Sequence, residues 1–203
     1  MCRLLETIMV RDGLIIHPAI HLRRMHNSAM ECFGSAGFPD PNQFLTVPPE
    51  ASGGVWRCRI IYGREIETVG FIPYTPRQVR SLKIVTDDLL DYHLKFADRS
   101  RLDELFGERG DCDDVIIAQH GRLTDTTIAN LVFYDGTKWH TPAHPLLPGT
   151  QREWLLESRQ IIESEITLSN YRSFQLAGMI NTFNDLENMQ VIPVSQIFPP
   201  DHI

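Results

Sequence analysis

The spacing of apolar positions divides the first part of the chain into strands and a helix. The apolar runs at 4–10 and 14–16 are separated by a turn that contains a glycine, which is typical of a β-hairpin. From Pro18 to Gly34 the apolar residues recur at helical spacing, and the runs at 55–62 and 66–72 again predict strands. The first part is therefore predicted to be an α+β unit in which the helix covers a sheet.

A break in the pattern predicts a second domain. The stretch 73–76 begins and ends with proline, so we predict domains at 1–75 and 80–203. The second domain opens with a predicted strand at 82–85 and a helix capped by Asp98 or Ser100. The elements expected after that helix are strands at 115–118, 123–134 and 139–141, a helix after Gly149 that turns Trp154, Leu155, Ile161 and Ile162 inward, a shorter helix at 171–177, and strands at 179–183 and 191–194.

Composition narrows the class of protein. The chain has 203 residues, 42% of them hydrophobic, which suffices for a core in one domain or in two small ones. No apolar run approaches the roughly 20 residues that span a bilayer, and the N-terminus lacks the apolar stretch of a signal peptide, so we expect a cytoplasmic protein without a membrane partner. A net charge of −7 without a basic cluster disfavours nucleic acid. The scattered cysteines predict neither a disulfide framework nor a metal site.

One lysine lies in a setting that favours chemistry. Lys95 has apolar neighbours and comes just before a predicted helix start. Partial burial and the positive end of the helix dipole would both lower the pKa of its amine, and a lowered pKa makes a lysine nucleophilic. Most lysines before helices are nevertheless solvated surface groups, so this pattern alone favours the surface interpretation.

Two other patterns are compatible with ligand binding. Gly149 precedes a predicted helix, so the backbone N–H groups of 149–152 could cradle a phosphate, although most such glycines only turn the chain. Arg57 and Arg59 have the same parity in a predicted strand, so both side chains emerge on one face, which is most often a solvated face. Binding of a small molecule by these residues therefore stays a possibility that the two patterns alone do not decide.

These residues occur in an order that resembles a known family. The motifs, in chain order, are Leu5-Glu-Thr-Ile8, His21-Leu-Arg-Arg-Met25 with Ser28, Lys95, the segment 123–133, Thr141-Pro142 and Leu147-Pro-Gly-Thr-Gln-Arg152. Across nearly its whole length the chain resembles the fold-type IV pyridoxal-phosphate enzymes, or class IV aminotransferase family, which includes branched-chain and D-amino-acid aminotransferases and 4-amino-4-deoxychorismate lyase. The resemblance implies an α+β fold with a small N-terminal α/β sandwich domain and a larger C-terminal pseudo-barrel domain that binds the cofactor.

The resemblance also implies catalytic roles for two residues. Lys95 would hold pyridoxal 5'-phosphate covalently and act as the general base. Asp125 stands where the family usually carries a glutamate against the pyridine nitrogen. An ionised carboxylate there keeps the ring nitrogen protonated and makes the ring a stronger electron sink. Without the resemblance, Asp125 would be interpreted as an edge-strand carboxylate among threonines.

Binding roles follow from the same resemblance. The cofactor phosphate would be held by residues from three separate segments, namely Arg24, Thr150 with Gln151, and Asn181 with Thr182. Gln151 stands where a threonine is common in the family, which makes Thr150 the alternative source of the hydroxyl. Arg57 and Arg59 match positions that select substrate carboxylates, and the sequence does not distinguish which of them faces the site.

The implied function is that of an enzyme acting on a small amino substrate as a homodimer. Our first expectation is 4-amino-4-deoxychorismate lyase, which forms 4-aminobenzoate and pyruvate for folate synthesis. The alternatives are an aminotransferase for branched-chain or D-amino acids, and a trimmed relative that does not catalyse. The chain begins at the strand that carries Glu6, so we expect the family's preceding strand and its active-site aromatic to be absent. The region after Ser169 is also short compared with the aminotransferases, and a trimmed site favours the lyase.

Overall fold

The computed structural model describes residues 2–35 and 37–200, which divide into two units. The first unit comprises Met1–Pro76 with Leu94–Asp98, and the second comprises Arg77–His93 with Arg99–Ile203. The change of unit after Pro76 follows the two prolines that break regular structure. The segment 94–98 lies with the first unit, whereas the sequence prediction counted it in the second domain.

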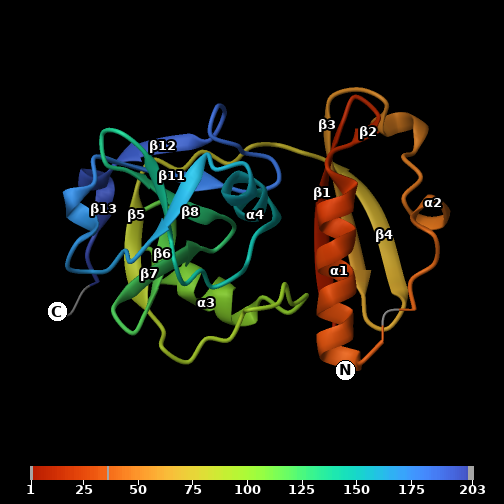
Figure 1. Ribbon diagram of the computed structural model, residues 1–203, viewed down its shortest axis with the longest axis horizontal. Helices are drawn as coiled ribbons and strands as arrows, with labels where there is room; N and C mark the ends of the chain where they lie inside the picture. Colours follow the sequence, from red (N-terminus) through yellow and green to blue (C-terminus); the bar gives the residue numbers. More distant parts are fainter. Residues whose placement is uncertain (1, 36, 201–203) are drawn as a thin grey trace. The chain divides into compact units, whose positions relative to one another are not determined.

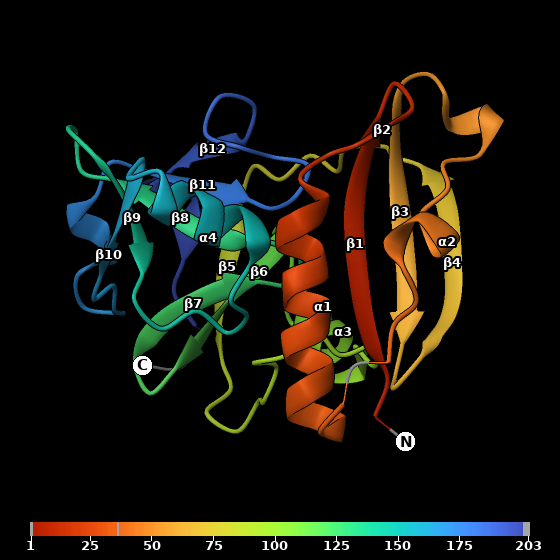
Figure 2. The ribbon, with the colours of Figure 1, turned by 45° about the vertical axis from the view of Figure 1, so that its right-hand side comes forward.

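An antiparallel sheet with the strand order β2-β1-β3-β4 forms the first unit. Its strands are β1 (Leu4–Arg11), β2 (Leu14–Ile15), β3 (Val55–Tyr62) and β4 (Ile66–Pro73). Helix α1 (Pro18–Phe33) runs along this sheet, and the short helices α2 (Pro41–Phe44) and η1 (Pro49–Ala51) lie in the connection to β3 (Figure 1, Figure 2). No helix in the part of the chain that the structure describes, α1 included, is long and apolar enough to cross a membrane.

Turn residues set the ends of the first hairpin and of α1. Asp12 and Gly13 both have a positive φ, 49° and 79°, as a two-residue hairpin turn requires. Pro18 occupies the first turn of α1, where its missing N–H costs no hydrogen bond. Gly34, with a φ of 68°, ends the helix and donates its N–H to the Met30 carbonyl. The helix therefore ends at the glycine that the sequence predicts.

The core of the first unit lies between α1 and one face of the sheet. Alternate residues of β1 and β3 point to this face, and Ile8, Cys58 and Ile60 are fully buried there. Met25 and Ala29 of α1, both fully buried, belong to the same cluster. The apolar periodicities of the helix and of the strands thus meet in one core, as the sequence predicts.

The segment Leu94–Asp98 runs beside β1. The Leu5 N–H donates to the Lys95 carbonyl at 2.8 Å, and the Ala97 N–H donates to the Arg3 carbonyl at 2.8 Å. These bonds satisfy backbone groups that β1 would otherwise leave open at its edge. They are the physical reason that the segment belongs to the first unit.

A mixed sheet builds the second unit. Seven strands follow the order β10-β9-β8-β7-β6-β5-β13, and β11 pairs with both β8 and β12. The elements are β5 (Leu82–Thr86), α3 (Ser100–Gly107), β6 (Asp114–Gln119), β7 (Arg122–Thr126), β8 (Asn130–Tyr134), β9 (Trp139–Pro142), α4 (Thr150–Glu157), β10 (Ile161–Ser164), η2 (Tyr171–Ser173), β11 (Leu176–Ile180), β12 (Gln190–Pro193), η3 (Val194–Gln196) and β13 (Ile197–Phe198). Ile84, Ile116, Leu131 and Phe133 are fully buried in its core. Sheets with few helices in both units confirm the α+β class.

The predicted strand at 123–134 is in fact two strands. β7 ends at Thr126 and β8 begins at Asn130, and Asp125 pairs with Asn130 across the reversal. The Thr126 hydroxyl accepts the Ala129 N–H at 3.1 Å and donates to the Ala129 carbonyl at 3.2 Å. A threonine that alternation alone assigns to a strand therefore closes a turn, because its side chain bonds to nearby backbone.

The helix predicted after Gly149 is observed as α4, and it is shorter than expected. α4 ends at Glu157, Arg159 has a φ of 56°, and β10 pairs in parallel with β9. Trp154 and Ile162 are 37% and 41% exposed, so the expectation that both point inward is wrong. Pairing with a remote strand ends the helix here, and helical periodicity does not reveal that pairing.

Two smaller expectations are also wrong. Arg99, rather than Asp98 or Ser100, is the N-cap of α3. The predicted helix at 171–177 is the single turn η2 followed by β11. In the second case, pairing of β11 with β8 and β12 overrides the local pattern.

Candidate active site

In the first unit, a buried carboxylate holds the predicted phosphate-binding arginine. Glu6 on β1 is fully buried, and it accepts hydrogen bonds from Arg24 Nε at 3.0 Å and from Arg24 Nη2. His21 Nδ1 lies 2.9 Å from the same carboxylate. Burial raises the pKa of Glu6, but the charge of Arg24 and the hydrogen bond from His21 outweigh burial, so this pKa lies well below its usual range. Glu6 therefore stays ionised and fixes the Arg24 guanidinium.

Replacing Glu6 by glutamine is expected to destabilise the protein by about 3 to 5 kcal/mol at neutral pH, because Arg24 loses its buried counter-charge. The folded-state pKa is depressed, so the carboxylate stabilises the fold above its unfolded pKa and loses this effect as the pH falls through the folded value. The difference between the two proteins should therefore shrink below about pH 4. Urea unfolding across this range measures it.

The matched control is Glu67→Gln. Glu67 forms an ion pair with Arg3 in which the side chains are 37% and 55% exposed. An exposed pair contributes less than about 1 kcal/mol, so this variant should be close to wild type. Equal losses of unfolding free energy in Glu6→Gln and Glu67→Gln would contradict the description of Glu6 as a buried partner of Arg24.

In the second unit, Asp125 is a buried carboxylate with both oxygens bound. The residue is 4% exposed, and it accepts from Asn130 Nδ2 at 2.8 Å and from the Leu147 N–H at 2.8 Å. Burial raises the pKa of Asp125 to about 7, against the lowering effects of the Leu147 N–H and the Asn130 amide. Both of these donors are neutral, so a cationic N–H would form a stronger, charge-assisted bond with this carboxylate.

The N-terminus of α4 lies against the same cluster. A Cβ at Gly149 would lie 1.9 Å from Asn130 Oδ1, so glycine is required by the close approach. Thr150, the first residue of α4, is 5% exposed, and within residues 2–35 and 37–200 its hydroxyl has no hydrogen-bond partner. Gln151 follows, half-buried, in the first turn. First-turn N–H groups have no partner inside a helix, so this end of α4 is suited to an anion such as a phosphate.

Strand β11 brings the predicted segment 181–182 to the turn between β7 and β8. Ile180 pairs with Asn130, and Asn181 Nδ2 donates to the Ile128 carbonyl at 3.3 Å. Asn181 Oδ1 accepts the Phe183 N–H at 2.9 Å. The Asn181 side chain therefore holds the turn that follows Asp125. Thr182 comes next in the chain and is half-buried.

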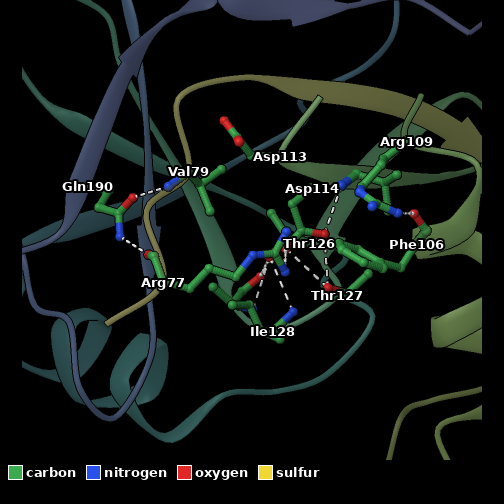
Figure 3. A network of polar contacts seen from close by, with 12 residues as sticks. Arg77, Val79, Phe106, Arg109, Asp113, Asp114, Thr126, Thr127, Ile128 and Gln190 are labelled. Carbon is green, nitrogen blue, oxygen red and sulfur yellow. Dashed lines mark hydrogen bonds and ion pairs between the residues drawn. The ribbon is translucent and has the colours of Figure 1, made fainter. Parts of the chain in front are cut away.

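A charged network supports this turn on the side of β6 (Figure 3). The Thr127 hydroxyl donates to both oxygens of Asp114, at 2.9 and 3.1 Å, and burial raises the pKa of Asp114. Arg77 Nη1 lies 3.5 Å from Asp114 Oδ2. The guanidinium groups of Arg77 and Arg109 lie over the Phe106 ring, at 4.5 and 4.1 Å from its centroid. These contacts fix the turn to its own unit.

The remaining predicted residues lie in the first unit. Lys95 is half-buried in the segment that pairs with β1. Arg57 is half-buried with its guanidinium 5.4 Å from the centre of the Tyr74 ring, whereas Arg59 is exposed. Strand alternation places both arginines on the sheet face opposite the core under α1. The structure therefore brings Arg57 and Arg59 to one face and places Arg24, which belongs to α1, on the other side of the sheet.

Two residues that sequence reasoning gave no role hold the predicted ones in place. Glu6 shares its parity with the buried residues Leu4 and Ile8, and a carboxylate at a core position needs a partner, which is a signal that the sequence contains. Asn130 leaves no such signal, because a single strand at 123–134 would keep it far from Asp125. Only the chain reversal reveals that contact.

Known proteins with a similar sequence and structure define the family. The model for amino-transferase class IV matches residues 101–197. An uncharacterized protein of Haemophilus influenzae is 36% identical over 188 residues, which are 92% of this chain and 100% of that protein. The chain therefore belongs to the class IV amino-transferase family.

Solved structures agree with this family. A Haemophilus somnus protein named "putative 4-amino-4-deoxychorismate lyase" is 31% identical with a TM-score of 0.85, over 92% of this chain and 98% of that one. A "hypothetical aminotransferase" of Mycobacterium tuberculosis, in its PLP-bound form, is 18% identical with a TM-score of 0.76, over 94% of this chain and 80% of that one. The second likeness concerns the fold alone, which is the fold-type IV architecture.

Proposed function

We propose that this protein is a pyridoxal-phosphate-dependent 4-amino-4-deoxychorismate lyase. The observation that supports the cofactor best is the buried carboxylate of Asp125, which has neutral donors on both oxygens and lies beside the N-terminus of α4. A basic ring nitrogen and a phosphate are the two groups that such a pair of features accommodates. The lyase, rather than another member of the family, is supported by the name of the 31% identical Haemophilus somnus protein.

Four of the predicted residues have a defined task in this proposal. Pyridoxal phosphate, when bound, supplies an electron sink for the carbon that carries the substrate's amino group. Lys95 would hold the cofactor, and its amine would remove the proton from that carbon. Asp125 keeps the ring nitrogen protonated. The phosphate would be bound by the first turn of α4 with the Thr150 hydroxyl, and Arg24 is the further residue that we propose for this role.

The proposed reaction needs no second substrate. After Lys95 takes the proton, the bond between the substrate ring and its enol-ether oxygen breaks, and the electron pair of this bond leaves with the oxygen. The released enolate takes up one proton at its terminal carbon and becomes pyruvate, while the ring becomes aromatic as 4-aminobenzoate. The two products together contain all atoms of the substrate. An aminotransferase must instead return the proton to the cofactor and then accept a keto acid.

We expect the protein, loaded with pyridoxal phosphate, to form pyruvate and 4-aminobenzoate from 4-amino-4-deoxychorismate without added keto acid. A coupled lactate dehydrogenase assay measures pyruvate, and chromatography measures 4-aminobenzoate. Arg57→Ala or Arg59→Ala should raise the KM about tenfold or more through loss of a charged contact with a substrate carboxylate.

Two other outcomes would replace this function. Conversion of branched-chain or D-amino acids with 2-oxoglutarate, and none of the aminochorismate, would assign an aminotransferase. Cofactor binding without turnover of either substrate class would assign a non-catalytic relative. The proposal also includes a homodimer, which the resemblance to the family implies, a cytoplasmic location, and a role in folate synthesis that follows from the lyase reaction.

A further inference from the structure

The Asn130 side chain lies at the centre of the polar cluster in the second unit. The residue is 6% exposed, and its Nδ2 donates to Asp125 Oδ1 and to the Leu147 carbonyl, both at 2.8 Å. The Leu147 carbonyl only accepts, whatever the protonation state of Asp125, so the Asn130 amide must turn its NH₂ group toward this carbonyl and its oxygen away. The orientation of this amide is therefore determined by hydrogen-bond chemistry.

Leu147 closes the cluster into a ring. Its N–H donates to Asp125 Oδ2 at 2.8 Å, while its carbonyl accepts from Asn130. The resulting bonds engage both oxygens of Asp125 and the Nδ2 group of Asn130. A carboxylate bound through both oxygens cannot rotate without breaking a hydrogen bond, so the plane of the Asp125 carboxylate is set by its neighbours.

Gly149 extends this arrangement to α4. A Cβ at this position would lie 1.9 Å from Oδ1 and 3.0 Å from Cγ of Asn130. The φ of Gly149 is −75°, which other residues adopt readily, so glycine is needed here for space and not for backbone conformation. The start of α4 therefore packs directly on the amide oxygen of Asn130.

We propose that Asn130 is a positioning residue that fixes two cofactor contacts relative to each other: the carboxylate for the ring nitrogen and the helix end for the phosphate. This inference rests on the proposed function, because pyridoxal phosphate is the ligand that needs both contacts. One side chain at the β7–β8 reversal sets both contacts before the cofactor binds. Contacts that are already in place cost little reorganisation, so disturbing Asn130 lowers both the affinity for the cofactor and the reaction rate.

The first test is Asn130→Asp, which keeps the size of the side chain and replaces its donors by acceptors. We expect the affinity of the cofactor-free protein for pyridoxal phosphate, measured by fluorescence titration, to fall about 10- to 100-fold, because buried acceptors lose their donors. Near-UV circular dichroism and cooperative unfolding establish that the variant is folded. Unchanged affinity in the folded variant would overturn the inference.

The second test is Gly149→Ala, which disturbs the same contact without changing a polar group. The added methyl must displace the Asn130 amide, so we expect a loss of cofactor affinity similar to that of the first variant. Gly107→Ala is the matched control, because a Cβ at Gly107 meets nothing within 4 Å, and it should bind the cofactor like the wild type. Equal affinities of the two alanine variants would contradict the proposed contact.

A double-mutant cycle separates positioning from general damage to the fold. If Asn130 acts through Asp125, Asn130→Ala should lower kcat about 10- to 100-fold in the wild-type background and less than about threefold in the Asp125→Ala background. Additive losses would refute the positioning role. A wild-type protein that binds no pyridoxal phosphate would overturn the proposed function and this inference with it, whereas normal wild-type binding with unaffected variants would overturn the inference alone.

Discussion

Replacing Lys95 by alanine should remove the yellow colour of the protein loaded with pyridoxal phosphate and lower its turnover by about 10⁴-fold. A lysine amine can both join the cofactor aldehyde and move the substrate proton, and loss of a positioned base alone costs about 10²- to 10⁴-fold. The absorbance spectrum reports the colour. Borohydride trapping followed by peptide mass mapping identifies the lysine that carries the cofactor.

The chain supplies the controls for this experiment. Its three lysines are Lys83, Lys95 and Lys138. Lys83 is half-buried on β5, and Lys138 is exposed just before β9. Lys83→Ala and Lys138→Ala should keep the colour and the trapped peptide. Trapping on Lys83 or Lys138 in the wild-type protein would remove Lys95 from the mechanism.

Asp125→Ala is expected to keep binding pyridoxal phosphate but to lose about 10²- to 10³-fold in turnover. The phosphate contacts hold the cofactor, whereas the ring nitrogen loses the carboxylate that keeps it protonated. Cofactor titration and steady-state kinetics measure the two effects separately. Asp125→Glu, which restores a carboxylate one methylene longer, should recover part of the rate. Wild-type turnover in Asp125→Ala would show that this carboxylate is not the ring partner.

The stability difference between the wild type and Asp125→Ala, both without cofactor, is expected to depend on pH. Burial raises the pKa of Asp125 from 3.8 to about 7 in the folded state. Because the folded value is the higher one, the stabilising contribution of the protonated carboxyl is complete below about pH 4 and is lost as the pH rises through about 7. Urea unfolding should therefore show that the wild type loses stability relative to Asp125→Ala across this range. A constant difference would mean that Asp125 is not buried as described.

Short-range signals in the sequence were enough to predict most helices and strands of the first unit. The hairpin turn at Asp12 and Gly13, the helix between Pro18 and Gly34, and the strands that follow depend on backbone preferences and apolar spacing within a few residues. Such signals need no knowledge of remote partners. The order of motifs around Lys95 likewise sufficed to predict the family, because each motif is a short run of neighbouring residues.

The tertiary structure alone decided which residues support the candidate site. Alternation in a strand tells which face a side chain takes, but it names no partner on another element. The reversal at 127–129 sets Asn130 opposite Asp125, and packing of α1 on the sheet sets Arg24 on Glu6. Both contacts satisfy buried polar groups whose partners are distant along the chain or hidden by a turn. Their formation depends on how the chain folds back, which the spacing of apolar positions does not specify.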